Sequence, residues 1–178
     1  MTPWFIATER FGPWDGDTWD SYVAWSGLTQ LEELVSLDGL LCPTVLEEIK
    51  DEYWPFIVNE DFLLEYFTDF EFLMAQLGGI AHKNVLCVFF NPEEPPQAPQ
   101  CGDFEFLGYD LIEREGSISA LTNCGGYPDV FANSELSRHG LLMDFERART
   151  VQRELRERYP DSQHADCNLF ALFRLVSV

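Results

Sequence analysis

The residues best suited to covalent chemistry are Cys124, His164 and Asp166. Cys124 comes directly before Gly125-Gly126, at the end of an expected strand where a substrate could approach the backbone closely. A cysteine attacks as its thiolate, so His164 could take the thiol proton and Asp166 could orient the imidazole. No local signature connects these residues, and an acidic surrounding would raise the thiol pKa. The Cys-Gly-Gly sequence therefore favours a tight turn. A small cysteine-dependent hydrolase is kept as the second alternative to a binding function.

Two groups of residues resemble metal ligands. His164 and Cys167 are three positions apart, and Asp15, Asp17 and Asp20 follow one another in the string DGDTWD. A closed zinc site needs about four matched ligands. DGDTWD also lacks the distal glutamate of a DxDxDG-type calcium loop and the glycine at the position that such a loop requires. We therefore expect no metal site and no cofactor.

Charge is the most unusual property of the chain. The 178 residues carry a net charge of −20. Residues 1–80 hold 16 acidic residues against Arg10 and Lys50, a net charge of −14, whereas residues 138–178 carry +1. Such a field repels nucleic acid and anionic membranes and attracts basic surfaces. It predicts a basic protein partner, with no direct nucleic-acid binding and no membrane binding.

An acidic and aromatic segment near the N-terminus is the first candidate for partner binding. It contains Trp14, Asp15, Asp17, Trp19 and Asp20. Tryptophan is enriched at binding hot spots, and carboxylates steer a basic partner and set its register. The other interpretation is that these tryptophans anchor an otherwise irregular N-terminal segment to the core.

A predicted helix over residues 60–77 supplies the second candidate. Its apolar residues fall on one face, and Asp61, Glu65 and Asp69 fall on the opposite face, one turn apart. Unpaired like charges at this spacing cost a few tenths of a kcal/mol each. A cationic partner would relieve that cost, although a solvated helix face is the ordinary reading of such a stripe.

A second predicted helix, over residues 144–159, is rich in arginine. Asp144 can cap it, and its basic residues are Arg147, Arg149, Arg153, Arg156 and Arg158. Glutamates interleave with these arginines and the field of the whole chain is anionic. We therefore expect the arginines to pair with the protein's own acids, in preference to forming a nucleic-acid patch.

The remaining elements predict the fold class. Further helices are expected over residues 29–36 and 44–52, and strands over residues 84–90, 104–112, 117–122 and 169–176. Residues 91–100, NPEEPPQAPQ, form a proline-rich loop that joins two strands of one sheet. Residues 1–178 are expected to form a single α+β domain, with a mostly antiparallel sheet packed against several helices.

Cysteine usage and the N-terminus predict the compartment. The five cysteines are an odd number and include no CxxC pair, which favours reduced thiols. Residues 1–10 lack the basic and apolar regions of a signal peptide. No apolar run approaches the ~18 residues of a membrane span. A cytoplasmic protein is expected.

Three segments resemble the small acidic immunity proteins that are encoded beside bacterial polymorphic toxins. They are FEFLGYDLIEREGSISALTNCGGYPDVF (residues 104–131), HADCNLFALFR (residues 164–174) and LDGLLCP (residues 37–43). The resemblance implies a role in bacterial competition, in which the protein occludes a cognate toxin, often a basic nuclease, by steered association without chemistry. These families share no catalytic motif, so no functional residue is transferred. The alternative is a nucleic-acid mimic that inhibits a DNA- or RNA-binding protein.

Overall fold

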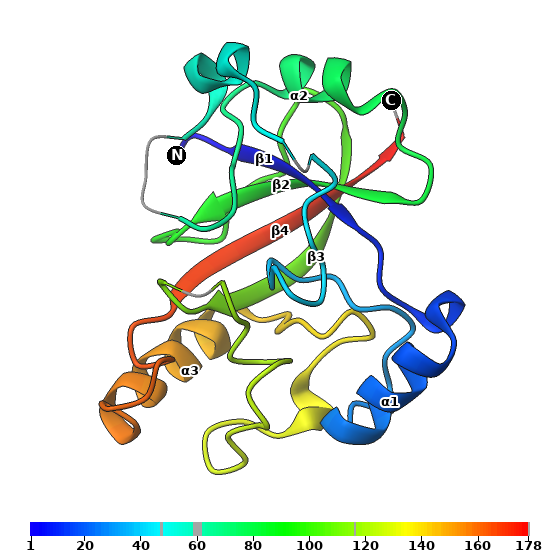
Figure 1. The fold of residues 1–178 in the computed structure, drawn as a ribbon. Helices are drawn as coiled ribbons and strands as arrows, with labels where there is room; N and C mark the ends of the chain where they lie inside the picture. Colours follow the sequence, from blue (N-terminus) through cyan, green and yellow to red (C-terminus); the bar gives the residue numbers. More distant parts are fainter. Residues whose placement is uncertain (47, 59–61, 116, 178) are drawn as a thin grey trace.

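A curved four-stranded antiparallel sheet forms the centre of the computed structural model, which describes residues 1–46, 48–58, 62–115 and 117–177. The strands are β1 (Trp4–Glu9), β2 (Lys83–Phe90), β3 (Asp103–Ile112) and β4 (Asn168–Ser177), in the order β1-β2-β4-β3. The helices are α1 (Asp17–Ser26), α2 (Phe70–Leu77) and α3 (Phe145–Arg158), with 3₁₀ turns η1 (Pro13–Asp15), η2 (Asp51–Phe56) and η3 (Asn133–Glu135). Figure 1 shows α2 at one end of the sheet and α1 and α3 at the other. This is the expected single α+β domain.

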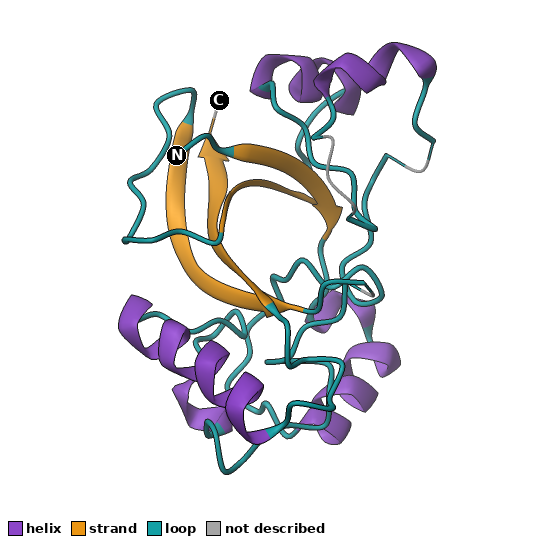
Figure 2. Ribbon diagram, turned by 90° about the vertical axis from the view of Figure 1, so that its left-hand side faces the viewer, coloured by secondary structure: helices purple, strands orange, loops and turns teal. Residues whose placement is uncertain are grey.

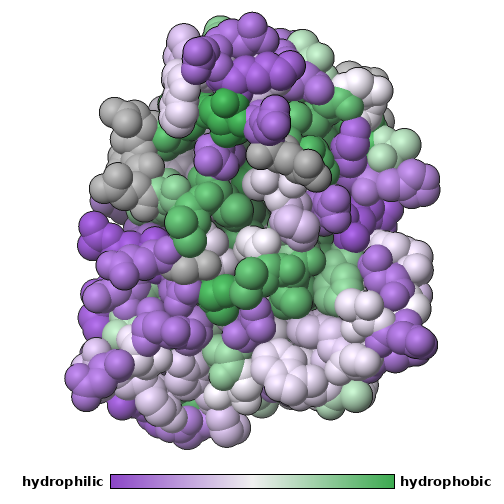
Figure 3. All heavy atoms as spheres, in the orientation of Figure 1, coloured by the Kyte–Doolittle hydropathy of each residue, from purple (hydrophilic) through white to green (hydrophobic). Residues whose placement is uncertain are grey.

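Both faces of the sheet are buried, which explains the nearly continuous apolar runs in its strands. Successive side chains of a strand point to opposite faces. In β2, Val85, Cys87 and Phe89 join the core that contains the three α-helices, whereas Leu86 and Val88 face a second core. Irregular segments cover that second face. Figure 3 shows apolar side chains across the middle of the face seen in Figure 1, between more hydrophilic side chains above and below.

A bulge in β3 admits a loop to the sheet. The register with β4 shifts between Phe106 and Gly108, and Gly108 has φ +138°. A Cβ atom there would lie 2.7 Å from Cβ of Leu141 and 2.8 Å from the carbonyl oxygen of Leu142. Glycine is therefore required where Tyr109 and Leu142 exchange backbone hydrogen bonds of 2.7 and 3.1 Å.

Four sequence predictions of regular elements are confirmed. The strands predicted at 84–90, 104–112 and 169–176 are β2, β3 and β4, and the arginine-rich helix is α3. The side chain of Asp144 caps α3 by accepting the amide hydrogen of Arg147 at 2.7 Å. The proline-rich loop joins β2 to β3 within one sheet, as expected.

The two helices predicted before residue 53 are wrong. Residues 29–36 contain no helix: the amide of Leu34 bonds to Phe11 and that of Val35 to His139, and the two side chains enter different cores. In the predicted helix 44–52, Val45 instead donates its amide hydrogen to Ala7 of β1 at 3.0 Å. Only the short turn η2 follows. Tertiary pairing outweighed weak local helix propensity in both segments. Glu47, within the second of these segments, lies outside the described residues.

Within the described part of the helix predicted over residues 60–77, only Phe70–Leu77 is helical. Phe67 exchanges backbone hydrogen bonds of 2.8 and 2.7 Å with Phe5, so the chain before α2 is extended alongside the outer edge of β1. Asp69 caps α2 by accepting the amide hydrogen of Phe72 at 2.8 Å, and Gly78, with φ +62°, ends the helix. An edge strand exposes free backbone groups, and Phe67 pairs with those of Phe5.

Three further differences concern short elements. Strand β1 and helix α1 have no counterpart among the elements predicted from the sequence. The strand predicted over 117–122 is reduced to one bridge between Ile112 and Ser119, flanked by two backbone hydrogen bonds.

In the part of the chain that is described, no helix combines the length and apolarity that crossing a bilayer requires.

Two buried carboxylates fasten the irregular segments to the sheet. Asp38 accepts the amide hydrogens of Leu40 and Leu41 at 2.9 and 3.0 Å with one oxygen. Its other oxygen accepts the backbone amide of Ser119 and the side-chain amide of Asn123, both at 2.9 Å. Asp110 of β3 accepts the hydroxyl hydrogen of Ser36 with one oxygen and that of Ser119 with the other. Burial raises the pKa of Asp110, against the effect of these two hydroxyls.

Replacing the Asp38 carboxylate should destabilise the fold strongly. Asp38→Ala leaves buried donors without an acceptor, which costs about 3 kcal/mol of unfolding free energy. Urea denaturation followed by circular dichroism measures this loss. Asp166→Ala, at a side chain that is 77% exposed, is the control and should change stability by less than about 0.5 kcal/mol. Equal losses in the two variants would contradict the anchoring role of Asp38.

Candidate functional site

A large groove lies where the proline-rich loop passes the beginnings of β1 and α2. It encloses about 860 Å³. Its lining residues come from three segments: Met1, Pro3 and Phe5; Thr68, Asp69, Phe70 and Glu71; and Phe89 with Glu94, Pro95, Pro96, Gln97, Ala98, Pro99, Gln100 and Cys101. Segments that are distant in sequence therefore form one concave surface, of a size usual for ligand sites.

The walls of the groove are apolar and held in place by packing. The rings of Phe5 and Phe70 lie 5.4 Å apart, and each also contacts the ring of Phe104, at 6.3 and 5.6 Å. The opposite wall contains Pro95, Pro96 and Pro99, whose rings fix the backbone φ angle. The groove is therefore formed before any ligand arrives.

Acidic side chains surround this apolar surface. Asp69, Glu71 and Glu94 line the groove and are all exposed. Among the described lining residues, no side chain is basic. Asp69 uses one oxygen to cap α2, and its charge remains at the groove. The arrangement suits a ligand that combines an apolar group with positive charge.

The acidic and aromatic N-terminal segment contains one buried and one exposed tryptophan. Trp19 is buried, with its ring 5.2 Å from that of Phe11, so it anchors α1 to the core. Trp14 is 55% exposed and lies under the guanidinium of Arg10, 4.6 Å from the ring centroid. Asp15 accepts the amide hydrogen of Gly12 at 2.9 Å, which stabilises η1. Asp17 and Asp20 are exposed in the first turn of α1.

The predicted binding residues do not form one surface. Figure 1 places α1, with its acids and tryptophans, at the opposite end of the molecule from α2. The predicted helical stripe is also wrong: Glu65 is half-buried in the extended chain before α2, and Asp69 is the cap of that helix. Asp61 lies outside the described residues. Of the predicted residues that the structure describes, Asp69 alone lines the large groove.

Sequence reasoning missed the proline-rich loop as part of a site. It treated residues 91–100 as a connection between strands. The available signal was the combination of four prolines with Glu93 and Glu94, an apolar and rigid segment that carries acids. Which helix such a loop covers depends on the order of the strands, which the sequence did not reveal.

The candidate thiol residues do not assemble as a nucleophile, base and orienting acid. Cys124 donates its thiol hydrogen to the carbonyl of Ala120 at 2.8 Å, and burial raises its pKa. His164 instead lies 3.8 Å from the sulfur of Cys167, and both side chains are buried. Asp166 is exposed and lies 3.6 Å from Arg156. A raised thiol pKa opposes nucleophilic attack, so this geometry gives the hydrolase alternative no support.

The predicted metal-ligand candidates are dispersed. His164 and Cys167 form an isolated buried pair, while Asp15 caps a turn and Asp17 and Asp20 face solvent. Over residues 1–46, 48–58, 62–115 and 117–177, no group of three or more His, Cys, Asp or Glu side chains is placed to hold a metal ion.

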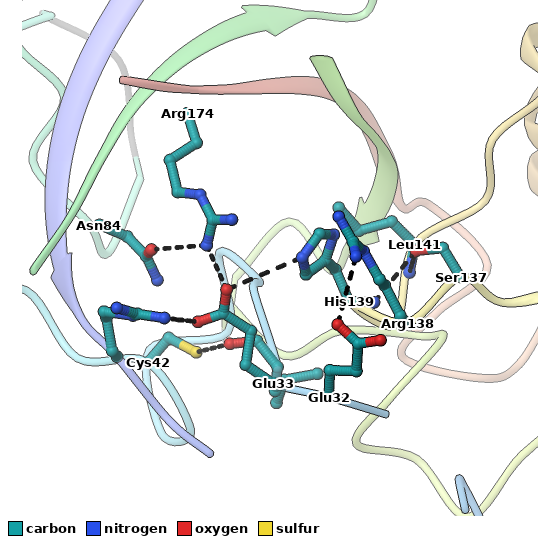
Figure 4. Close-up of polar contacts among 11 residues, drawn as sticks. Glu32, Glu33, Cys42, Asn84, Ser137, Arg138, His139, Leu141 and Arg174 are labelled. Carbon is teal, nitrogen blue, oxygen red and sulfur yellow. Dashed lines mark hydrogen bonds and ion pairs between the residues drawn. The ribbon is translucent and has the colours of Figure 1, made fainter. Parts of the chain in front are cut away.

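A buried charge cluster centres on Glu33 (Figure 4). Arg10 donates from Nη2 and Nε to one carboxylate oxygen, at 2.7 and 3.0 Å. Arg174 of β4 donates to the other oxygen, and Nε2 of His139 lies 3.7 Å from it. Burial, together with the nearby Arg174, lowers the pKa of His139 and favours the neutral imidazole. Arginines from two segments donate to the two carboxylate oxygens, and His139 from a third lies beside them, so the cluster connects three segments of the chain.

Loss of the Glu33 charge should reduce stability in a pH-dependent way. Burial raises the pKa of Glu33, but the hydrogen bonds from Arg174 and Arg10 outweigh it and hold the pKa below its ordinary value. A depressed carboxyl pKa contributes stability above the unfolded-state pKa of about 4.3, and this contribution is lost as pH falls through the folded-state value. Glu33→Gln should therefore lower the unfolding free energy by about 3 kcal/mol at pH 7.

The difference between Glu33→Gln and the parent chain should shrink as the pH falls below about 4. Urea titrations of both proteins from pH 3 to pH 8 measure it. The raised pKa of Asp110 affects both proteins and cancels in the comparison. A difference that stays constant over this range would show that Glu33 acts through its shape alone.

Cys101, the cysteine that lines the groove, should be the first thiol to react with a labelling reagent. Cys101 is exposed, whereas Cys42, Cys87 and Cys167 are buried and Cys124 is partly buried. Burial and the neighbouring Glu71 raise the pKa of Cys101, so its labelling by N-ethylmaleimide should be slow at pH 7 and accelerate with rising pH. Mass spectrometry should find the first adduct on Cys101. A fast phase that persists in Cys101→Ala would contradict this order.

The described surface thus offers an acid-rimmed apolar groove at one end and an acidic, tryptophan-bearing helix at the other. No family model matches the chain, and no curated protein or solved structure is significantly similar to it.

Proposed function

We propose that this chain is a cytoplasmic immunity protein that binds a basic toxin domain and occludes it, with the acid-rimmed groove as the centre of the interface. The observation that carries the proposal is the composition of the groove. The groove has a volume of about 860 Å³ and preformed apolar walls. Asp69, Glu71 and Glu94 border it, and no basic side chain is among its described lining residues. A protruding loop or helix end that presents an apolar side chain between lysines or arginines fits this surface.

Charge and apolar surface have separate tasks in this proposal. The net charge of −20 accelerates the approach of a basic protein and orients it. Exposed ion pairs contribute only ~0–1 kcal/mol each, so they do not supply tight binding alone. Burial of an apolar side chain against Phe5, Phe70 and Phe89 supplies the desolvated centre that hot spots require.

Inhibition by occlusion requires no reaction on this chain. The groove contains one thiol, that of Cys101, and its raised pKa keeps it protonated at neutral pH. The groove also favours a protein target over nucleic-acid mimicry. A mimic presents rows of carboxylates in place of phosphates, whereas here the acids surround an apolar floor.

The direct experiment uses the product of the gene immediately upstream. Its C-terminal domain is expressed alone and together with this chain in a bacterial host. The proposal expects growth arrest by the domain alone, restored growth with the chain present, and co-purification of the two proteins. A domain that arrests growth equally in the presence of the chain would contradict the proposal.

Neutralising the groove acids should weaken binding selectively. The variant Asp69→Asn/Glu71→Gln/Glu94→Gln removes three charges, and asparagine still caps α2. We expect slower association and an affinity loss of about tenfold, because three rim charges of up to ~1 kcal/mol each are lost. Stopped-flow kinetics at low and high salt measure both effects.

The matched control for that variant is Glu115→Gln/Glu146→Gln/Glu157→Gln, three exposed acids with the same charge change. It should alter affinity less than threefold, since overall charge mainly affects the association rate. Equal losses in the two triple variants would mean that only net charge matters. A loss confined to Trp14→Ala/Asp17→Asn/Asp20→Asn would place the partner on α1 instead of the groove.

A further inference from the structure

A second cavity on this acidic protein is basic. It encloses about 410 Å³ between α3, the end of β2 and the beginning of β4. Its lining residues are Asn91, Arg149, Gln152, Arg153, Arg156, Cys167 and Asn168. The three arginines are four and three residues apart on α3, so they lie on one helix face. Figure 1 shows the end of β2 and the beginning of β4 on the same side of the sheet as α3.

The floor of this cavity is fixed by hydrogen bonds. The amide of Asn91 donates to Leu169 at 2.7 Å, and the side-chain oxygen of Asn91 accepts the Leu169 amide hydrogen at 2.8 Å. The Asn91 side-chain nitrogen donates to Oδ1 of Asn168 at 2.9 Å. This orientation leaves Nδ2 of Asn168 as a donor beside the cavity.

The arginines of the cavity are poorly neutralised by the protein itself. Within the described chain, Arg153 makes no hydrogen bond or ion pair, and Arg149 contacts only the neutral side chain of Gln152, at 3.3 Å. Arg156 lies 3.6 Å from the exposed carboxylate of Asp166. Gln152 in turn donates to the carbonyl of Cys167 at 2.8 Å, which positions the acceptor that holds Arg149.

The other arginines of α3 differ. Arg147 donates to Glu135 at 2.6 Å, and Arg158 lies 3.8 Å from Asp129 and 3.7 Å from Glu154. The expected pairing with the protein's own acids is therefore confirmed for Arg147, Arg158 and Arg156. It is wrong for Arg149 and Arg153. Both unpaired arginines, Arg149 and Arg153, line the cavity beside Arg156.

We propose that this cavity binds a small phosphorylated molecule. Guanidinium groups present planar pairs of donors that match phosphate oxygens, and two such groups with one amide donor surround a phosphate effectively. The cavity is within the size range of sites for small ligands. It lies apart from the acid-rimmed groove in its lining residues, so this inference does not depend on the proposed function.

A small ligand is favoured over a nucleic acid by the charge of the whole molecule. A polyanion extends beyond the cavity and is repelled by the net charge of −20. A single phosphate experiences mainly the three local arginines, because charges beyond about 8–10 Å are screened at physiological salt.

Isothermal titration calorimetry with the full chain tests the proposal. The probes are AMP, inorganic phosphate, adenosine and a ten-nucleotide single-stranded DNA, at 50 mM NaCl. We expect AMP to bind, adenosine to show no binding, and the DNA to bind more weakly than AMP. Binding of inorganic phosphate as tightly as AMP would also support the site and assign recognition to the phosphate alone.

Matched variants locate the binding. Arg149→Gln/Arg153→Gln should weaken AMP binding at least tenfold, whereas Arg114→Gln/Arg138→Gln, with the same charge change on exposed residues, should alter it less than twofold. Thermal unfolding confirms that both variants are folded. The proposal is overturned if neither AMP nor phosphate binds the parent chain, if the two variants weaken binding equally, or if the DNA binds more tightly than AMP.

Discussion

The buried carboxylate of Glu33 is the contact on which the rest of the structure depends. It joins Arg10, just after β1, to Arg174 in the middle of β4 and to the loop that carries His139. A buried charge is tolerated only when paired and hydrogen-bonded, so these segments must meet at this point. The irregular chain around residues 28–42 and 136–143 is thereby fixed against the sheet, with Asp38 and Asp110 completing the attachment.

This interior cluster also determines the character of the surface. Residues 1–80 contain only two basic side chains, and the cluster engages one of them, Arg10. The other, Lys50, lies 5.7 Å from the ring of Tyr53. The exposed acids of this half of the chain therefore keep most of their field, which is the basis for proposing a basic partner. Positive charge gathers at α3, where the arginine-lined cavity lies. The loop between β2 and β3 contributes to both places, with Asn91 at the cavity and Glu94 to Cys101 at the groove.

The sequence predicted the parts of the fold whose pattern is set locally. Strands β2, β3 and β4 are apolar runs with clear ends, and α3 has a capping aspartate and a strong amphipathic pattern. The apolar pattern gave a wrong helix prediction where neighbouring side chains enter different cores, as those of Leu34 and Val35 do. Apolar spacing in such a segment does not indicate one buried helix face. The pattern failed again before α2, where Phe67 completes the edge of β1, since strand pairing at long range leaves no local signal. For the candidate site, the sequence indicated acids beside aromatics, and the lining of the groove contains both kinds of residue. It could not show that α1 and Asp69 lie at opposite ends, or that the proline-rich loop forms a wall of the groove.

The central claim is that a basic protein occupies the acid-rimmed groove. Hydrogen–deuterium exchange of this chain, free and mixed with the C-terminal domain of the protein encoded immediately upstream, tests it most directly. The account predicts slower exchange on binding at the amides of residues 68–71 and of the non-proline residues from Glu94 to Cys101, which line the groove. Exchange there should depend little on binding if the groove is not the interface. Slower exchange confined to α1 or α3, with residues 68–71 and 94–101 unchanged, would contradict the claim.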